Sequence, residues 1–230
     1  MPTAHRCIIF RMPKTPTLTE QLLCQEASKF AQAQSIVPVA ALYGVTDGKA
    51  VGTHVEHAFS AHLAQLYDFT PCNSAEGVDF ADIPADMKVT SVKQPQSSSP
   101  FKSARQKIFG LGYGVLVFVY EKTDDPKTAM SLLKIVHTIY IEKERTADYT
   151  MTRLILEHLK VKPDVDDLIG LMRDKNLPLD FDIEAPKLAA EIIRNPPLEG
   201  FLTISNALQW RLQYNHAIKH AGTTQGVNRL

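Results

Sequence analysis

The sequence contains few of the features that mark secreted, membrane or zinc-binding proteins. Its three cysteines, Cys7, Cys24 and Cys72, are widely spaced, and none has the C-x-x-C spacing of a thiolate metal site. A sparse, odd set of thiols is typical of a reducing compartment, where disulfides are rare. The longest strongly apolar run, Val115–Tyr120, is far shorter than the ~20 residues that span a bilayer. The apolar stretch near Met1 is too short for a signal peptide, so we expect a cytoplasmic protein without a membrane partner.

The chain also lacks a net charge, because 25 Lys and Arg residues balance 25 Asp and Glu residues. Overall charge therefore argues neither for nor against a nucleic-acid partner, and only its local distribution is informative. The 230 residues are 44% hydrophobic and 22% charged, which is ordinary for a globular protein. That length can bury a substantial core without disulfides.

Apolar periodicity and turn residues predict a core with alternating helices and strands. The predicted elements are helices Thr17–Gln34 and Val51–Tyr67, strands Gly77–Ala81 and Ala85–Lys93, helix Phe101–Phe109, strands Val115–Tyr120 and Leu132–Ile141, and helix Thr146–Lys160. This order predicts an α/β fold with a central mixed β-sheet flanked by helices. After residue 160, prolines separate short helical segments, the last being Ser205–His220. We therefore expect residues 1–160 to form the core and residues 161–230 a C-terminal helical extension, within a single domain.

Smaller features refine these boundaries. Thr17 and Glu20 have the spacing of a capping box at the first helix. Asp47–Lys49 predicts a turn, and residues 94–100 predict a polar loop. Ser99 and Pro100 are expected to start the Phe101–Phe109 helix.

The two strands at residues 77–93 carry more charge than a half-buried hairpin normally does. Side chains alternate faces along a strand, so Asp86 and Lys88 share a face. A bend at Ile83-Pro84 would bring Asp79 close to that face. Two carboxylates at a sheet rim repel one another and resist burial, and a divalent cation would resolve the conflict. An incomplete shell of oxygen ligands suits Mg²⁺, and a nearby lysine could orient a water for phosphodiester cleavage.

An ordinary interpretation competes with this one. Asp-x-Lys on a strand is most often a solvated face with a weak surface ion pair, and on this tripeptide alone that interpretation is the better one. Glu56, on the preceding predicted helix, could bring a third carboxylate to the same metal, although a solvent-facing glutamate is equally ordinary. Asp82 could replace Asp79 as the first ligand, but turns are rich in aspartate, so we prefer Asp79.

The charge distribution after this hairpin favours a phosphate-binding surface. Between Met87 and Tyr120 there is no Asp or Glu, whereas the same window holds five cations. Cations, amides and hydroxyls of this kind contact the phosphate backbone of nucleic acids, and a helix N-terminus adds backbone donors. The candidate DNA-binding residues are Lys93, Gln94, Gln96, Ser97, Ser98, Ser99, Lys102, Arg105 and Lys107.

The ordered motifs resemble a known superfamily. A helix with Glu56, then Asp79, then Asp86-Met-Lys88, a helix with Gln106 and a buried strand are similar to the PD-(D/E)xK nucleases. The passage KVTSVKQPQSSSPFKSARQKIFGLGYGVLVFVYEK resembles a type II restriction endonuclease, and IYIEKERTADYTMTR and LTISNALQWRLQY extend the resemblance over nearly the whole chain. The short interval between Asp79 and Asp86 departs from the usual pattern, and it leaves Asp82 as the alternative first aspartate.

The resemblance implies a function and a role for each matching residue. Asp79 and Asp86 would hold Mg²⁺, which Mn²⁺ could replace, and Glu56 would be an accessory ligand, directly or through water. Lys88 would assist the attacking water, and Gln106 would support the site or contact DNA. The expected protein is a homodimer in a bacterial or archaeal cytoplasm that cuts double-stranded DNA at a specific sequence, with a methyltransferase protecting that sequence. The alternatives are a structure-specific DNA repair nuclease of the same fold and a non-catalytic DNA-binding module.

Overall fold

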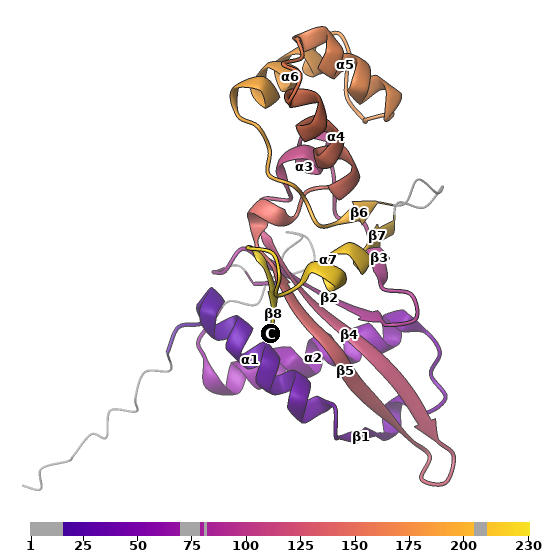
Figure 1. Cartoon of the computed structure of the whole chain (residues 1–230). Helices are drawn as coiled ribbons and strands as arrows, with labels where there is room; N and C mark the ends of the chain where they lie inside the picture. Colours follow the sequence, from indigo (N-terminus) through magenta and orange to yellow (C-terminus); the bar gives the residue numbers. More distant parts are fainter. Residues whose placement is uncertain (1–15, 70–78, 81, 205–210) are drawn as a thin grey trace, which may run out of the picture.

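A long antiparallel pair of strands, β4 (Gly114–Asp125) and β5 (Met130–Ile141), forms the centre of the molecule in the computed structural model, which describes residues 16–69, 79–80, 82–204 and 211–230. β2 (Ala85–Ser91) runs parallel to β4. β1 (Pro38–Val39) and β8 (Val227–Arg229) pair antiparallel with β5. The described strands of this mixed sheet have the order β1-β5-β4-β2, with β8 on β5, so β2 lies at an edge (Figure 1).

Two helices cover one face of this sheet, as predicted. They are α1 (Glu20–Gln34) and α2 (Gly48–Leu66) (Figure 1). Their apolar stripes pack against Leu116 and Phe118, which alternate along β4 with side chains on the opposite face. Glu26 of α1 links the two helices, because its buried carboxylate contacts His62 of α2 and Tyr67, the residue that follows α2.

The opposite face of the sheet is covered by C-terminal segments. Val115, Val117 and Val119 of β4 form one buried cluster with Leu212 and Tyr214. Leu212 belongs to a second sheet with the order β3-β7-β6, made of β3 (Gln96–Ser98), β7 (Arg211–Gln213) and β6 (Thr203–Ile204). α7 (Asn215–His220) and β8 complete this layer. The α/β fold with a central mixed sheet flanked by helices is therefore confirmed.

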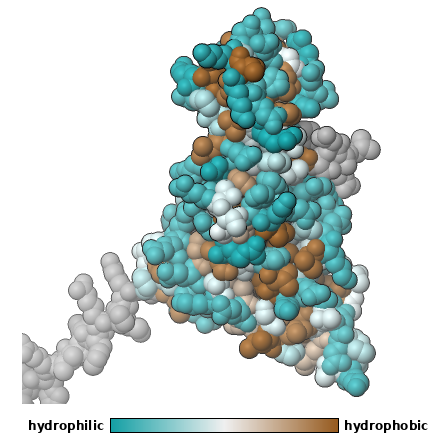
Figure 2. All heavy atoms as spheres, in the orientation of Figure 1, coloured by the Kyte–Doolittle hydropathy of each residue, from teal (hydrophilic) through white to brown (hydrophobic). Residues whose placement is uncertain are grey.

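A helical unit lies at one end of the sheet (Figure 1). It consists of α3 (Ala104–Phe109), α4 (Tyr149–Leu159), α5 (Val165–Asp174) and α6 (Glu184–Arg194), which share a third buried cluster. Short 3₁₀ turns at Ala40–Leu42 and Lys143–Arg145 precede other elements. Figure 2 shows a surface that is mostly hydrophilic, with hydrophobic patches on the part that contains the sheet. Within the described residues, no helix is long and apolar enough to cross a membrane.

Several local predictions were wrong. The Asp47–Lys49 segment is not a turn, because Asp47 caps α2 and the helix begins at the next residue. The N-cap of α1 is Thr19, whose hydroxyl accepts the Leu22 N–H. α3 begins at Ala104 with Ser103 as its cap, three residues after the predicted start.

The larger errors concern which segments pair. The predicted loop at 94–100 contains β3, and the predicted helix Ser205–His220 contains β7 before α7 begins. Residues 205–210 and most of the predicted strand Gly77–Ala81 lie outside the described residues. Of that strand, Phe80 makes an isolated antiparallel bridge to Ala85. β2 finds its long partner in β4 and not in a hairpin, because burial of a whole strand against the central sheet outweighs one local turn.

Candidate active site

The edge strand β2 presents its polar side chains on one face and its apolar side chains on the other. Met87 is buried against the core under α1 and α2, and Val89 packs beside it. Asp86, Lys88 and Thr90 therefore lie on the opposite face, toward the second sheet. Among the described strands only β4 pairs with the length of β2, so the other edge of β2 is free. Lys88 is the more exposed side chain of this face, because Asp86 and Thr90 are buried.

Asp86 and Lys88 form the central pair of the site. Lys88 Nζ lies 2.7 Å from Asp86 Oδ2, and the two side chains are 26% and 6% exposed. Burial raises the pKa of Asp86 to about 7, and the neighbouring Asp79 carboxyl raises it further, whereas the Lys88 ammonium opposes the shift. Since burial outweighs one cation, the site without a metal holds a proton near neutral pH that a divalent cation would displace.

A tight turn places Asp79 beside this pair. The Asp79 and Phe80 N–H groups both donate to the Ala85 carbonyl, at 3.2 and 3.3 Å, and this closes the turn that contains Asp82. Asp79 Oδ2 accepts the Met87 N–H at 2.7 Å, and the Asp79 carboxyl lies within hydrogen-bonding reach of Asp86. Asp82 is exposed in the turn. The structure thus brings Asp79 to the face of Asp86 and Lys88, as the sequence predicted.

Glu56 approaches the same edge from α2. This helix crosses β2 closely, because a Cβ added at Gly52 would lie 3.9 Å from the Val89 Cβ. Glu56 is partly buried, and burial raises its pKa, with a further contribution from the negative charge of Asp79. The Lys88 ammonium lowers it. Glu56 therefore belongs to the electrostatic neighbourhood of the site.

The donor set fits a hydrated divalent cation. Within the described residues, no three His, Cys, Asp or Glu side chains are close enough to form a ligand set by themselves. The Met87 N–H points to the outer edge of β2, where Asp79 accepts it, and the carbonyl of the same residue points to that edge as well. Two carboxylates, one carbonyl and several waters match the oxygen-rich and incompletely dehydrated shell of Mg²⁺.

Sequence reasoning missed two tyrosines near the carboxylates. Tyr113 precedes β4, and burial, followed by the charges of Asp86 and Asp79, raises its pKa to about 12. Tyr214 is fully buried after β7, and its hydroxyl lies 2.7 Å from Ser97 Oγ. Burial raises the pKa of Tyr214, and the Asp86 charge adds to the shift. For Tyr113 the local signal was its position between two glycines, at 112–114. Gly114 is needed there because a Cβ would overlap the phenol of Tyr140.

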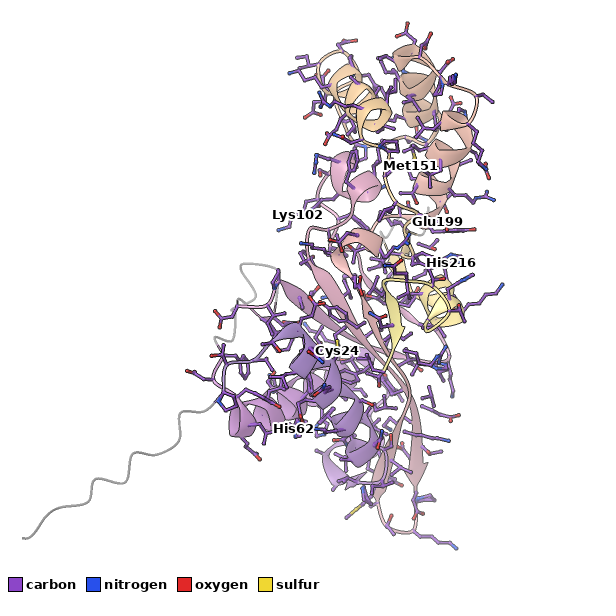
Figure 3. All side chains as sticks on the ribbon, turned by 60° about the vertical axis from the view of Figure 1, so that its left-hand side comes forward. Cys24, His62, Lys102, Met151, Glu199 and His216 are labelled. Carbon is purple, nitrogen blue, oxygen red and sulfur yellow. The ribbon has the colours of Figure 1, made fainter. Side chains whose placement is uncertain are left out.

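The predicted DNA-binding residues occupy different environments. Lys93, Gln94, Ser98, Lys102 and Arg105 are exposed, whereas Gln96, Ser97 and Ser99 are partly buried. Figure 3 shows Lys102 between the helical unit and the central sheet. The Ser97 hydroxyl points inward to Tyr214, and Ser99 Oγ accepts the Phe101 N–H at 3.4 Å. The exposed members form the better candidates for phosphate contacts.

The α3 residues have local structural roles. The Gln106 amide oxygen accepts the Lys102 N–H at 2.7 Å, and this supports the start of the helix. Arg105 pairs with Glu191 of α6 at 2.7 Å. Lys107 is only 8% exposed, and burial lowers its pKa while the charge of Asp148 opposes that shift. We therefore leave Lys107 out of the candidate DNA contacts, because a buried ammonium does not face a phosphate.

Comparison with known proteins identifies the family of the chain. The family model described as type II restriction enzyme NspV matches residues 17–229. The type II restriction enzyme NspV of Nostoc sp. (strain ATCC 29411 / PCC 7524) is 56% identical over 210 residues, which cover 91% of this chain and 95% of that protein. No solved structure matches the chain. The resemblance predicted from the motifs is confirmed, and the chain belongs to the NspV family of type II restriction enzymes.

Proposed function

We propose that this site-specific deoxyribonuclease cleaves double-stranded DNA with Mg²⁺ bound by Asp79 and Asp86, while Lys88 assists the attacking water. The carrying observation is the Lys88–Asp86 contact of 2.7 Å on an edge strand whose Met87 N–H is held by Asp79. Membership of the type II restriction enzyme family supports the activity and its dependence on a divalent metal. The identity of that metal as Mg²⁺ rests on the oxygen donors of the site.

The chain's own residues would perform three tasks. Asp79 and Asp86 provide the negative charge that holds the cation at the free edge of β2. Lys88 Nζ, held by Asp86, donates a hydrogen bond to the nucleophilic water or to a phosphoryl oxygen. Burial of Asp86 strengthens these interactions, since electrostatic forces increase when water is excluded. The bound cation supplies Lewis acidity for phosphodiester hydrolysis, and the expected products carry 5′-phosphate and 3′-hydroxyl ends.

The DNA backbone would lie along the exposed polar residues beside β2. Lys93 and Lys102 supply positive charge, and Gln94 and Ser98 supply hydrogen-bond donors. Arg105 is 61% exposed in spite of its ion pair with Glu191, so it can contribute at the rim. Gln96, Ser97 and Ser99 border this surface, and Gln106 supports it through the Lys102 backbone.

A homodimer is the expected assembly, because two-fold symmetry matches a palindromic site and brings one active site to each strand. A methyltransferase that modifies the same sequence would protect the host DNA in the cytoplasm. Light scattering with and without a duplex carrying the cleavage site tests the assembly. A monomer that binds the duplex one to one would contradict the dimer.

Digestion of unmethylated phage DNA tests the activity. We expect discrete fragments with Mg²⁺ or Mn²⁺ and none with EDTA, and the mapped ends should share one sequence. Cleavage only at branched or damaged DNA would instead indicate a structure-specific nuclease. Sequence-selective binding without cleavage in either metal would indicate a DNA-binding module.

A further inference from the structure

The second sheet has one face made of hydrogen-bonding side chains. Directly opposite residues of an antiparallel pair share a face. Gln96 of β3 faces Gln213 of β7, and Ser98 faces Arg211. Thr203 of β6 also faces Gln213 and so joins the same face. Two amides, a guanidinium and two hydroxyls are therefore presented together.

This polar face is the outward one. Ser97 and Leu212 are paired on the other face of the sheet. Leu212 is fully buried, Ile204 packs against the same cluster, and Ser97 contacts the buried Tyr214. Because that face is fixed inward, the face with Gln213 and Arg211 is turned to solvent.

The second sheet is fastened to the catalytic strand. Thr90 Oγ1 accepts the Gln96 N–H at 2.9 Å and donates to the Gln96 carbonyl at 3.1 Å. Thr90 is two residues from Lys88 on the same face of β2, a separation of about 7 Å along a strand. Two base-pair steps span about the same length of DNA. A duplex whose scissile phosphate reaches Lys88 would thus bring neighbouring base pairs to this sheet.

The two glutamines on this face have unused hydrogen-bonding capacity. Gln96 and Gln213 are partly buried, yet their amides make no hydrogen bond to any other described residue. Glutamine can bind adenine and arginine can bind guanine, each through two hydrogen bonds to base edges in the major groove. The major groove is wide enough for a two-stranded β-ribbon, which matches the β3–β7 pair.

We propose that the outward face of the β3-β7-β6 sheet is the base-reading surface of this endonuclease, and that Gln213 and Arg211 contact base edges in the major groove. This inference rests on the proposed DNA cleavage at β2, because the Thr90 link defines which base pairs are read. It separates specificity, carried by the second sheet, from cleavage, carried by the edge of the central sheet. The exposed lysines contribute affinity without sequence information.

The test compares Gln213→Ala and Arg211→Ala with the wild type and with Gln32→Ala. Gln32 is exposed on α1, across the central sheet from the second sheet. Phage DNA digestion first gives the cleavage sequence. Each variant is then measured for kcat/KM and for binding in Ca²⁺ on duplexes that differ from that sequence at one base pair. Thermal melting checks that each variant is folded.

Each Ala variant should lose roughly 5- to 150-fold in kcat/KM on its cognate duplex, the range for one bidentate base contact. Each variant should stop discriminating against substitutions at one base pair of the site and still discriminate at the others. That base pair should be A·T for Gln213→Ala and G·C for Arg211→Ala. Gln32→Ala should match the wild type. Unchanged discrimination at every position, even with lower rates, would overturn the proposal. A different outcome would reject the catalytic proposal alone. In it, the wild type binds DNA selectively without cleaving it, and the Ala variants lose that selectivity in binding.

Discussion

Replacement of Asp86 by asparagine should stabilise the metal-free enzyme while it removes cleavage. The Asp86 residue is buried, and burial raises the pKa of its carboxyl from 3.8 to about 7. One pKa unit corresponds to about 1.4 kcal/mol, so ionised Asp86 costs the native state about 4 kcal/mol above neutral pH. Asparagine keeps the shape and an acceptor for Lys88, and it carries no charge to bury.

The sign of the pH dependence follows from the raised pKa. Below the unfolded pKa the carboxyl is protonated in both states and adds no penalty. The penalty grows as pH rises from the unfolded pKa of 3.8 towards the native pKa of about 7, and it is complete above that value. Urea unfolding in EDTA should therefore show the gap between the variant and the wild type widening by about 3 kcal/mol from about pH 5 to about pH 9.

Two results would refute this reasoning. The first is a variant that is no more stable than the wild type at the higher pH, and the second is a gap that does not widen. Saturating Mg²⁺ provides the control, because a cation held by Asp86 stabilises the wild type and gives little to Asp86→Asn. Equal stabilisation of both proteins would locate the metal elsewhere.

Three further substitutions test other parts of the structure. Lys88→Met should abolish detectable cleavage in a digestion assay but keep DNA binding, and cutting at the wild-type rate would remove Lys88 from the mechanism. Lys102→Gln should weaken binding to all duplexes equally and reduce the salt slope by about 1, as fluorescence anisotropy over a salt series can check; a change in sequence preference would contradict a phosphate contact. An added Cβ at Gly200 would overlap the Ala147 carbonyl, whereas one at Gly170 of α5 meets nothing. Gly200→Ala should therefore destabilise by about 3 kcal/mol and Gly170→Ala stabilise by about 1 kcal/mol, and the reverse order in thermal unfolding would refute this packing.

The elements with strong local signals could be predicted from the sequence. The unbroken apolar run that begins at Val115 predicted the central strand, and the helical spacing of Val55, Phe59 and Leu63 predicted α2. These signals are local, because a strand buried on both faces has an unbroken apolar run and a helix buried on one side has apolar residues at helical spacing. The alternation of Asp86 and Lys88 likewise predicted which side chains share a face.

The pairing of distant segments could not be predicted in this way. β3 consists of Gln-Ser-Ser, which has no strand signal, and it exists because Thr90 and β7 satisfy its backbone. Ile204, Leu208 and Leu212 are spaced by four and suggested a helix, yet Leu212 is buried between the outward-facing Arg211 and Gln213 of a strand. Burial of Lys107 was equally invisible, since it depends on α4 and its preceding residues packing against α3.

The most direct test of the catalytic site is a crystal structure with a cognate duplex and Mn²⁺, located by anomalous scattering. The account predicts a peak within coordination distance of the Asp79 and Asp86 carboxylates, beside the scissile phosphate, with Lys88 Nζ facing the attacking water. A peak that lies away from both carboxylates, while the crystals still cleave the duplex, would contradict the placement of the active site at the edge of β2.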